Sequence, residues 1–158
     1  MRIIMNYLSE EELIAYAKDY LKQRGFKKKN KRWTKVSGIF TLCFYIQGSC
    51  WDKNDYYIRP GIFINGLEKS GLSYYGHFWL TIDNTLPPDK IFDEFEKFCT
   101  EWTNIPLIKD RAEKHQAWIE RNPLDKRRAG LVDYDKDPRS DILIKCSDII
   151  IEYLINKL

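Results

Sequence analysis

The chain has 158 residues, of which 44% are hydrophobic and 31% are charged, and its formal net charge is +3. A chain of this length is most simply one domain, with a core large enough to be stable without disulfides or metal. The apolar content excludes a disordered protein, and no uncharged apolar stretch reaches the roughly 18 residues of a membrane span. The apolar run after Met1 is also too short for a secretory signal. We therefore expect a single cytoplasmic domain over residues 1–158.

The segment Ser9 to Arg24 predicts the first helix. Ser9 is a good N-cap, and Glu12 stands at the position that completes a capping box. Gly25 and Phe26 follow in the order of a Schellman motif, in which the glycine is left-handed and the next residue packs back on the helix.

The stretch 39–47 predicts the central strand of a sheet. It is rich in β-branched and aromatic residues, and both of its alternating faces are apolar. Phe40, Leu42, Phe44 and Ile46 fall on one face, and Ile39, Cys43 and Tyr45 fall on the other. Such a strand is typical of the middle of a sheet, with cover on both sides.

Period-two patterns predict further strands on either side of the central one. Residues 27–30 predict a polar turn, and Lys31–Val36 predicts a strand that forms a hairpin with the central strand. Tyr56–Asn65 predicts another strand, interrupted at Pro60-Gly61 by a bulge or an edge position. Leu72–Asp83 predicts a fourth, with Tyr74, Phe78, Leu80 and Ile82 on one face and Tyr75, His77 and Trp79 on the other.

Beyond Asp83 the apolar period changes to that of helices. Pro87-Pro88 opens an amphipathic helix that ends before Ile105-Pro106, and a second helix covers about Leu107–Arg121. The segment 124–138 has no assignment beyond a possible short strand at Gly130–Tyr134.

The last helix, about Ser140–Lys157, is apolar over most of its surface. It therefore lies deep in the core or is shared with a partner, for example a second copy in a homodimer. Short connections favour antiparallel pairing. The expected fold class is thus α+β: an antiparallel sheet of about four strands packed by an N-terminal helix and C-terminal helices.

The sequence shows no arrangement typical of a catalytic or metal site. It lacks the G-x-S-x-G elbow, the phosphate-binding loop and the acid-x-lysine triplet of metal-dependent nucleases. The cysteines, Cys43, Cys50, Cys99 and Cys146, form no C-x-x-C pair, which favours free thiols over a zinc site. Cys50 with His77 is the one nucleophile–base pair to consider. We expect no enzyme activity, no metal and no cofactor.

Basic residues are concentrated between Lys22 and Lys35, where no acid occurs, while the rest of the chain has more acids than bases. The simplest interpretation is a solvated edge that opposes aggregation. The others are a site for an acidic protein partner and a nucleic-acid site, in which Lys28, Lys29 and Arg32 contact phosphates and Trp33 stacks on a base.

Aromatic residues are also concentrated in one part of the sequence, between positions 51 and 79. Trp51, Tyr56, Tyr57, Tyr74, Tyr75, His77 and Trp79 occur with Arg59 on neighbouring strands and loops. Most of them are expected in the core. If no helix covers the second face of the sheet, the remainder form an exposed Tyr/Trp/Arg surface, which is the composition of protein-binding hot spots.

Three motifs resemble a known family. They are Gly25-Phe26-Lys27-Lys28 after the first helix, Gln47-Gly48-Ser49 after the central strand, and the strand from Tyr57 to Phe63. Together they resemble a bacterial family called domain of unknown function 4304, over roughly the first half of the chain. The resemblance implies structural roles for Gly25, Phe26, Gln47 and Ser49, and the last two are expected to fix a turn. It also implies similarity to small immunity proteins.

The favoured function is a non-enzymatic protein that binds a partner, and neutralisation of a toxin is the leading hypothesis. The candidate contact residues are Lys28, Lys29, Arg32, Trp33, Trp51, Arg59, Tyr75, His77 and Trp79. The alternative is a nucleic-acid-binding module that uses the basic hairpin 27–33.

Overall fold

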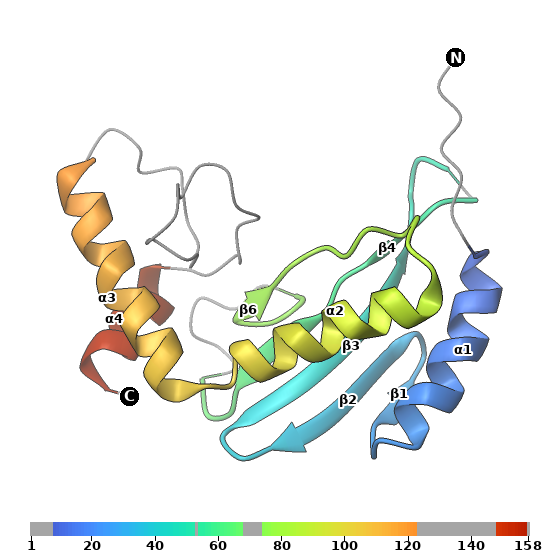
Figure 1. Ribbon diagram of the computed structural model, residues 1–158, viewed down its shortest axis with the longest axis horizontal. Coiled ribbons are helices and arrows are strands. Elements are labelled where there is room, and N and C mark those ends of the chain that lie inside the picture. Colours follow the sequence, from blue (N-terminus) through green and yellow to red (C-terminus); the bar gives the residue numbers. More distant parts are fainter. Residues whose placement is uncertain (1–7, 53, 68–73, 123–147, 158) are drawn as a thin grey trace.

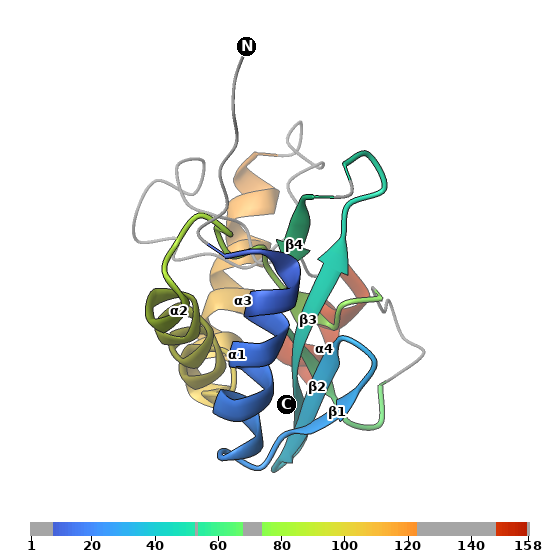
Figure 2. The ribbon, with the colours of Figure 1, turned by 90° about the vertical axis from the view of Figure 1, so that its right-hand side faces the viewer.

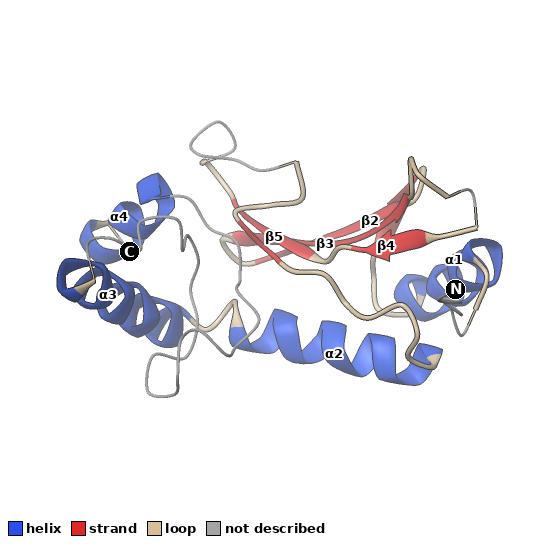
Figure 3. Cartoon of the chain, turned by 90° about the horizontal axis from the view of Figure 1, so that it is seen from above, coloured by secondary structure: helices blue, strands red, loops and turns tan. Residues whose placement is uncertain are grey.

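The computed structural model describes residues 8–52, 54–67, 74–122 and 148–157. One antiparallel sheet runs through the middle of the molecule, and the helices lie on one face of it and at one end (Figures 1 and 3). This arrangement confirms the α+β fold class with an N-terminal helix and C-terminal helices.

The sheet is built around the predicted central strand. Its strands are β1 (Lys27–Lys29), β2 (Arg32–Ser37), β3 (Phe40–Gly48), β4 (Tyr56–Ile58), β5 (Gly61–Ile64) and β6 (Phe78–Trp79). The spatial order is β1-β2-β3-β5-β6, and β4 pairs with the end of β3 beyond β5. Strand β3 thus pairs with three others, and its place in the middle of the sheet is confirmed.

The strands depart from expectation at three places. Residues 27–29 form strand β1 rather than a turn, because they pair with β2 across a tight turn at Asn30, whose φ is 58°. Pro60 has no backbone N–H for a ladder, and the predicted strand Tyr56–Asn65 divides there into β4 and β5. Of the predicted strand Leu72–Asp83, the described residues keep β6 and an isolated bridge between Ile82 and Ile58, with Gly76 at a φ of 142° just before β6; residues 72 and 73 lie outside the described chain.

Helix α1 (Glu10–Lys22) begins and ends as its sequence predicts. The Ser9 side chain accepts from the Glu12 backbone N–H at 3.1 Å, and the Glu12 carboxylate accepts from the Ser9 N–H at 3.2 Å. At the other end, Gly25 has a φ of 86° and the Phe26 N–H donates to the Leu21 carbonyl at 3.0 Å. These bonds satisfy backbone groups at both ends of the helix that have no partner within it.

The remaining helices are α2 (Pro88–Glu101), α3 (Ile105–Arg121) and α4 (Asp148–Asn156). The break between α2 and α3 is where the sequence places it, but Ile105 and Pro106 open α3, since proline is accepted in a first turn. The predicted strand Gly130–Tyr134 lies outside the described residues. Of the helices that the structure describes, none has the length and apolar character to cross a lipid bilayer.

Two clusters of buried side chains make the core. Helices α1 and α2 pack on one face of β2, β3 and β4, through residues that include Leu13, Leu21, Trp33, Phe44, Ile46, Phe92 and Phe95. Helices α3 and α4 pack with β5 and β6, through residues that include Ile62, Phe78, Trp102, Ile108, Ile150 and Leu154. Helix α4 therefore contributes to the core of its own chain, and a homodimer through it stays a prediction.

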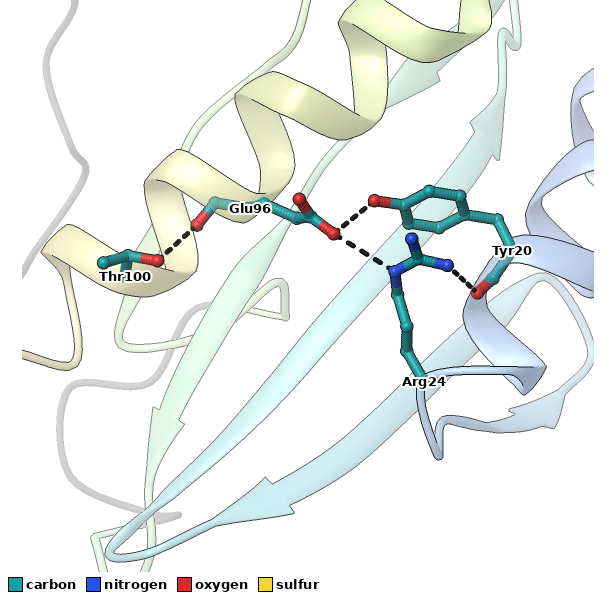
Figure 4. A network of polar contacts seen from close by, with 4 residues as sticks. All are labelled: Tyr20, Arg24, Glu96 and Thr100. Atoms are coloured by element: carbon teal, nitrogen blue, oxygen red, sulfur yellow. Dashed lines mark hydrogen bonds and ion pairs between the residues drawn. The ribbon is translucent and has the colours of Figure 1, made fainter.

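A polar contact on the surface joins α1 to α2 (Figure 4). The Tyr20 hydroxyl and the Arg24 Nε both donate to the Glu96 carboxylate, the second at 3.1 Å. The Arg24 guanidinium also lies 3.4 Å from the centre of the Tyr20 ring and donates to the Tyr20 carbonyl at 3.0 Å. Arg24 thus has an aromatic ring and a carboxylate as partners at the same time.

We expect Tyr20→Phe to lower the free energy of unfolding by about 1 kcal/mol at pH 8, because one hydrogen bond to a half-exposed carboxylate is lost. Burial and the bond to Glu96 raise the pKa of Tyr20 from 10.0 to about 12 in the folded protein. The stabilisation is fully present below pH 10 and is lost as the pH rises to about 12. In urea unfolding, the difference between the two proteins should shrink over that range.

The control for this measurement is Tyr16→Phe, since the Tyr16 ring stacks on the Tyr20 ring at 6.2 Å. Its hydroxyl has no hydrogen bond to the part of the chain that the structure describes. Equal losses in the two variants would show that removal of a phenol hydroxyl in general, and not loss of the bond to Glu96, accounts for the effect.

Candidate functional site

The second face of the sheet, opposite α1 and α2, carries no helix among the described residues (Figures 2 and 3). We call it the open face. Strand alternation and the ladder register assign its residues: Arg32 lies opposite Tyr45, and Gln47 lies opposite Tyr57. The neighbours Trp33, Phe44 and Ile46 point to the helices. The open face is therefore lined by polar and aromatic side chains of the sheet itself.

Arg59, between β4 and β5, is held on the open face by neutral groups. Its Nε donates to the Gln47 Oε1 at 2.9 Å, and its Nη1 donates to the Thr81 Oγ1 at 2.9 Å. The same Gln47 oxygen accepts from the Tyr75 hydroxyl at 2.9 Å. Gln47 therefore fixes both the arginine and one of the rings beside it.

Three aromatic rings surround the Arg59 guanidinium. Its central carbon lies 4.9 Å from the ring centres of Tyr57 and Tyr75 and 5.4 Å from that of Trp79. The Tyr75 and Trp79 rings also contact each other, with their centres 4.8 Å apart. Cation–π contacts of this kind contribute about 0.5–1 kcal/mol each at exposed sites.

Arg32, on β2, occupies a similar position. Its guanidinium carbon lies 4.8 Å from the Tyr45 ring centre and 4.4 Å from that of Tyr74, and Nη2 donates to the Tyr74 carbonyl at 3.2 Å. Ring contacts from Tyr45 and Tyr74 to Tyr75, at 6.1 and 5.6 Å, join the two arginines into one surface. We call it the arginine–aromatic cluster: Arg32, Tyr45, Gln47, Tyr57, Arg59, Tyr74, Tyr75, Trp79 and Thr81.

A glycine in β5 lets the segment with Tyr74 and Tyr75 cross the open face. A Cβ atom on Gly61 would lie 1.7 Å from the Tyr75 carbonyl oxygen, so any side chain there would displace the crossing segment. Gly61 pairs with Trp79 of β6, next to the crossing point. The position of two rings in the cluster therefore depends on the absence of a side chain at Gly61.

Cys43 is on the open face, where it pairs with Gly61 of β5, and it is fully buried. Burial raises the pKa of its thiol from 9.0 to about 11, against the opposing effect of the Arg32 charge. Burial likewise raises the pKa of Cys99 to about 12. Neither thiol is activated as a nucleophile, because a nucleophilic cysteine needs a depressed pKa.

The pair of Cys50 and His77 is not brought together. His77 is buried at the end of the sheet where Phe40 pairs with Ile64: its Nδ1 accepts from the Ile64 N–H, and its Nε2 contacts the Leu67 carbonyl, both at 2.7 Å. Cys50 follows the opposite end of β3, which is roughly 25 Å long. The His77 ring therefore serves as a backbone partner of β5, not as a surface residue.

The basic stretch is divided between the two faces. Lys29 pairs with Arg32 and lies on the open face. Lys28 pairs with Trp33 and lies on the helix side, where its Nζ is 5.7 Å from the centre of the Trp33 ring. Trp33 is only 1% exposed, so its indole is part of the core. These basic residues are close together in the sequence, but they contribute to two different surfaces of the folded protein.

Two other candidates lie in the loop between β3 and β4. Trp51 is 90% exposed. Ser49 accepts from the backbone N–H groups of Trp51 and Asp52 at 3.1 and 3.2 Å, so it fixes the turn that carries this tryptophan. Gln47 differs from the expectation for it, since its side chain bonds to Arg59 and Tyr75 and not to a local turn.

Of the predicted contact residues, the structure brings Arg32, Arg59, Tyr75 and Trp79 together. It adds Tyr57 and Tyr74 from the predicted aromatic concentration, Gln47, which was expected to fix a turn, and Tyr45 and Thr81, which the sequence had not indicated as site residues. The signal for Tyr45 and Gln47 was their shared parity on β3, opposite to Phe44 and Ile46. No three His, Cys, Asp or Glu side chains in the described ranges gather in a metal-binding arrangement.

Comparison with known proteins identifies the family. The model of a family described as "Domain of unknown function (DUF4304)" matches residues 17–128, and the chain belongs to this family. The matched segment includes every residue of the arginine–aromatic cluster. No curated protein and no solved structure matches the chain.

We expect Gly61→Ala to lower the free energy of unfolding by about 2 kcal/mol, because the new methyl group would force the Tyr75 backbone to move. Gly48→Ala is the matched control, since a Cβ there lies at an ordinary 3.5 Å from the nearest atom, the Lys31 Nζ. Thermal unfolding with circular dichroism measures both. A Gly61→Ala protein as stable as Gly48→Ala would show that the crossing segment does not pack closely on β5.

Proposed function

We propose that this member of the DUF4304 family acts in the cytoplasm by binding a partner protein through the arginine–aromatic cluster, without catalysing a reaction. The observation that carries the proposal is the cluster itself: two arginines and five aromatic rings on a sheet face that no described helix covers. Tyr, Trp and Arg are the residues that dominate binding energy at protein–protein interfaces.

The cluster is also held in place before any partner arrives. Arg59 and Tyr75 are both bonded to Gln47, and the rings of Tyr75 and Trp79 are in contact. Side chains that are already ordered lose little conformational entropy on binding, so more of their contact energy contributes to affinity. Tyr74, which lies beside Arg32 and Tyr45, is 67% exposed and provides area for a partner to cover.

The chemistry of the cluster suits binding better than proton transfer. Its side chains are arginine, tyrosine, tryptophan, glutamine and threonine, and none of these types has an ordinary pKa near 7. The Cys43 thiol, on the same face of the sheet, has its pKa raised to about 11 by burial.

Neutralisation of a bacterial toxin is the form of binding that we propose from the resemblance to immunity proteins. An immunity protein must hold one partner tightly and needs no turnover. A rigid face with several potential hot-spot residues meets that requirement.

A nucleic-acid site on the hairpin 27–33 has less support. Its stacking residue, Trp33, is in the core, and its lysines are divided between two faces of the sheet. The binding experiment below therefore distinguishes nucleic acid from a protein partner.

The test is affinity capture from the source cells with three immobilised baits: the wild type, Arg59→Ala, and Arg24→Ala as control. Arg24 matches Arg59 in charge and in its stacking on a tyrosine, but it lies between α1 and α2. Each captured protein is then purified, and its affinity and stoichiometry are measured by titration calorimetry. We expect one protein to bind 1:1 and to lose about tenfold or more in affinity with Arg59→Ala only.

Parallel capture from nuclease-treated lysate at low and moderate salt separates the alternatives. Material that is lost on nuclease treatment or on raising salt would point to nucleic acid. A partner that binds Arg59→Ala as tightly as the wild type would overturn the proposed site, and the absence of any 1:1 partner would overturn the proposed function.

A further inference from the structure

Arginines stacked on aromatic rings occur on both sides of the sheet, and their charged partners differ. Arg24 stacks on Tyr20 and pairs with Glu96 at 3.1 Å. Arg111 likewise lies over the Trp102 ring, at 4.6 Å, and its Nη2 is 3.8 Å from a carboxylate oxygen of Glu101. Each of these two ring-stacked arginines on the helix side thus forms an ion pair with a glutamate of the same chain.

The two arginines of the open face have the rings but only neutral acceptors. Within the part of the chain that the structure describes, Arg59 bonds to an amide and a hydroxyl, and Arg32 bonds to a backbone carbonyl. No described Asp or Glu forms an ion pair with either of them. Both therefore have charge that a ligand can neutralise.

The contacts of Arg59 leave one edge of its guanidinium for a ligand. Gln47 accepts from the Nε–H and Thr81 accepts from one Nη1–H, so, counted over the described ranges, the other Nη1–H and both N–H groups on Nη2 remain. The Nη1 and Nη2 groups form a planar fork that can donate one hydrogen bond to each oxygen of a carboxylate. The bonds to Gln47 and Thr81 fix the direction of this fork.

The charge of the open face favours an anionic ligand. Its strand positions include Lys27, Lys29 and Arg32 and carry no acidic residue in β1 to β6. An acidic segment placed there would gain from the fork and from this surrounding positive charge.

The ring geometry distinguishes a protein segment from nucleic acid. Base stacking needs ring faces that are open to solvent. Here guanidinium groups lie over Tyr45, Tyr57, Tyr74, Tyr75 and Trp79, and the Tyr74 ring is steeply inclined to those of Tyr45 and Tyr75, at 72° and 84°. Such rings present edges and partly covered faces, which suit apolar side chains better than stacked bases.

We propose that the open face binds an acidic segment of the partner protein, with an Asp or Glu carboxylate held by the Nη1–Nη2 fork of Arg59 and a second acidic group near Arg32. The proposal rests on the proposed function and specifies the partner's chemistry. In effect, the partner supplies to Arg59 the carboxylate that Glu96 supplies to Arg24 (Figure 4).

The test measures fluorescence anisotropy with three labelled probes on the full chain at about 0.15 M salt. The probes are a peptide with four glutamates spaced by glycine and phenylalanine, the same peptide with glutamine for glutamate, and a thymidine oligonucleotide of equal charge. We expect the glutamate peptide to bind about tenfold or more tightly than the glutamine peptide, because the bonds to a carboxylate are charge-assisted.

Arg59→Lys is the informative variant, because lysine keeps the positive charge and lacks the fork. It should weaken the glutamate peptide about tenfold, whereas the control Arg24→Lys should leave it unchanged. A titration followed by NMR of the arginine Nε–Hε signals should show saturable shifts for Arg59 but not for Arg24. Urea unfolding of both variants checks that the binding losses do not follow stability.

Each other outcome overturns the inference. One such outcome is equal affinity for the two peptides. Another is equal affinity of Arg59→Lys and the wild type for the glutamate peptide. The third is an oligonucleotide that binds more tightly than the glutamate peptide and depends on Arg59. If the peptides fail while a captured partner still depends on Arg59, the carboxylate inference falls and the proposed function stands. If no partner depends on Arg59 either, both fall.

Discussion

Strand β3 has large side chains on both faces, but described helices cover only one of them. Phe44 and Ile46 are buried against α1 and α2, whereas Cys43 and Tyr45 face the other way. Apolar area on that second face must still be removed from water. The arginine–aromatic cluster lies on this face, where Cys43 is fully buried and its ladder partner Gly61 is crossed by the segment with Tyr75. Arginine suits such a position, because its stem covers apolar surface while its head stays hydrated.

The cluster joins segments that are far apart in the sequence. Arg32 comes from β2, Gln47 from β3, Arg59 from the connection of β4 to β5, and Tyr75 from the segment that crosses Gly61. The cluster can form only when the strand order and the crossing are both in place. The binding surface that we propose is thus a consequence of the tertiary fold, and no single hairpin of the chain would reproduce it.

Local signals in the sequence were sufficient for much of the fold. The capping box at Ser9, the glycine end of α1 and the two-sided strand β3 are short-range patterns, and the structure has each of them. The possibility of an exposed Tyr/Trp/Arg face also followed from alternation, because one parity of each strand must face away from the helices.

Longer-range features were outside the reach of those signals. Tyr74 and Tyr75 lie in a turn, so both join the cluster although their parities differ. The φ of 142° at Gly76 then changes the phase of the chain, and His77 is buried although it has the parity of Tyr75. The basic stretch looked continuous only because strand pairing had not yet divided Lys28 from Lys29. The role of Gln47 depends on Arg59 and Tyr75, which its local sequence does not show.

The comparison between Arg24 and Arg59 indicates why a partner would gain from the open face. The Arg24–Glu96 pair is about half exposed, and exposed ion pairs contribute little, typically about 0–1 kcal/mol. A carboxylate brought to Arg59 by a partner would meet a guanidinium beside three rings, and the partner would exclude water from the pair. Coulomb attraction rises as the effective dielectric falls. The guanidinium is already partly removed from water by the rings, so its remaining desolvation cost on binding is reduced. The same residue types that join two helices on one side of the sheet can therefore provide a stronger contact between two proteins on the other.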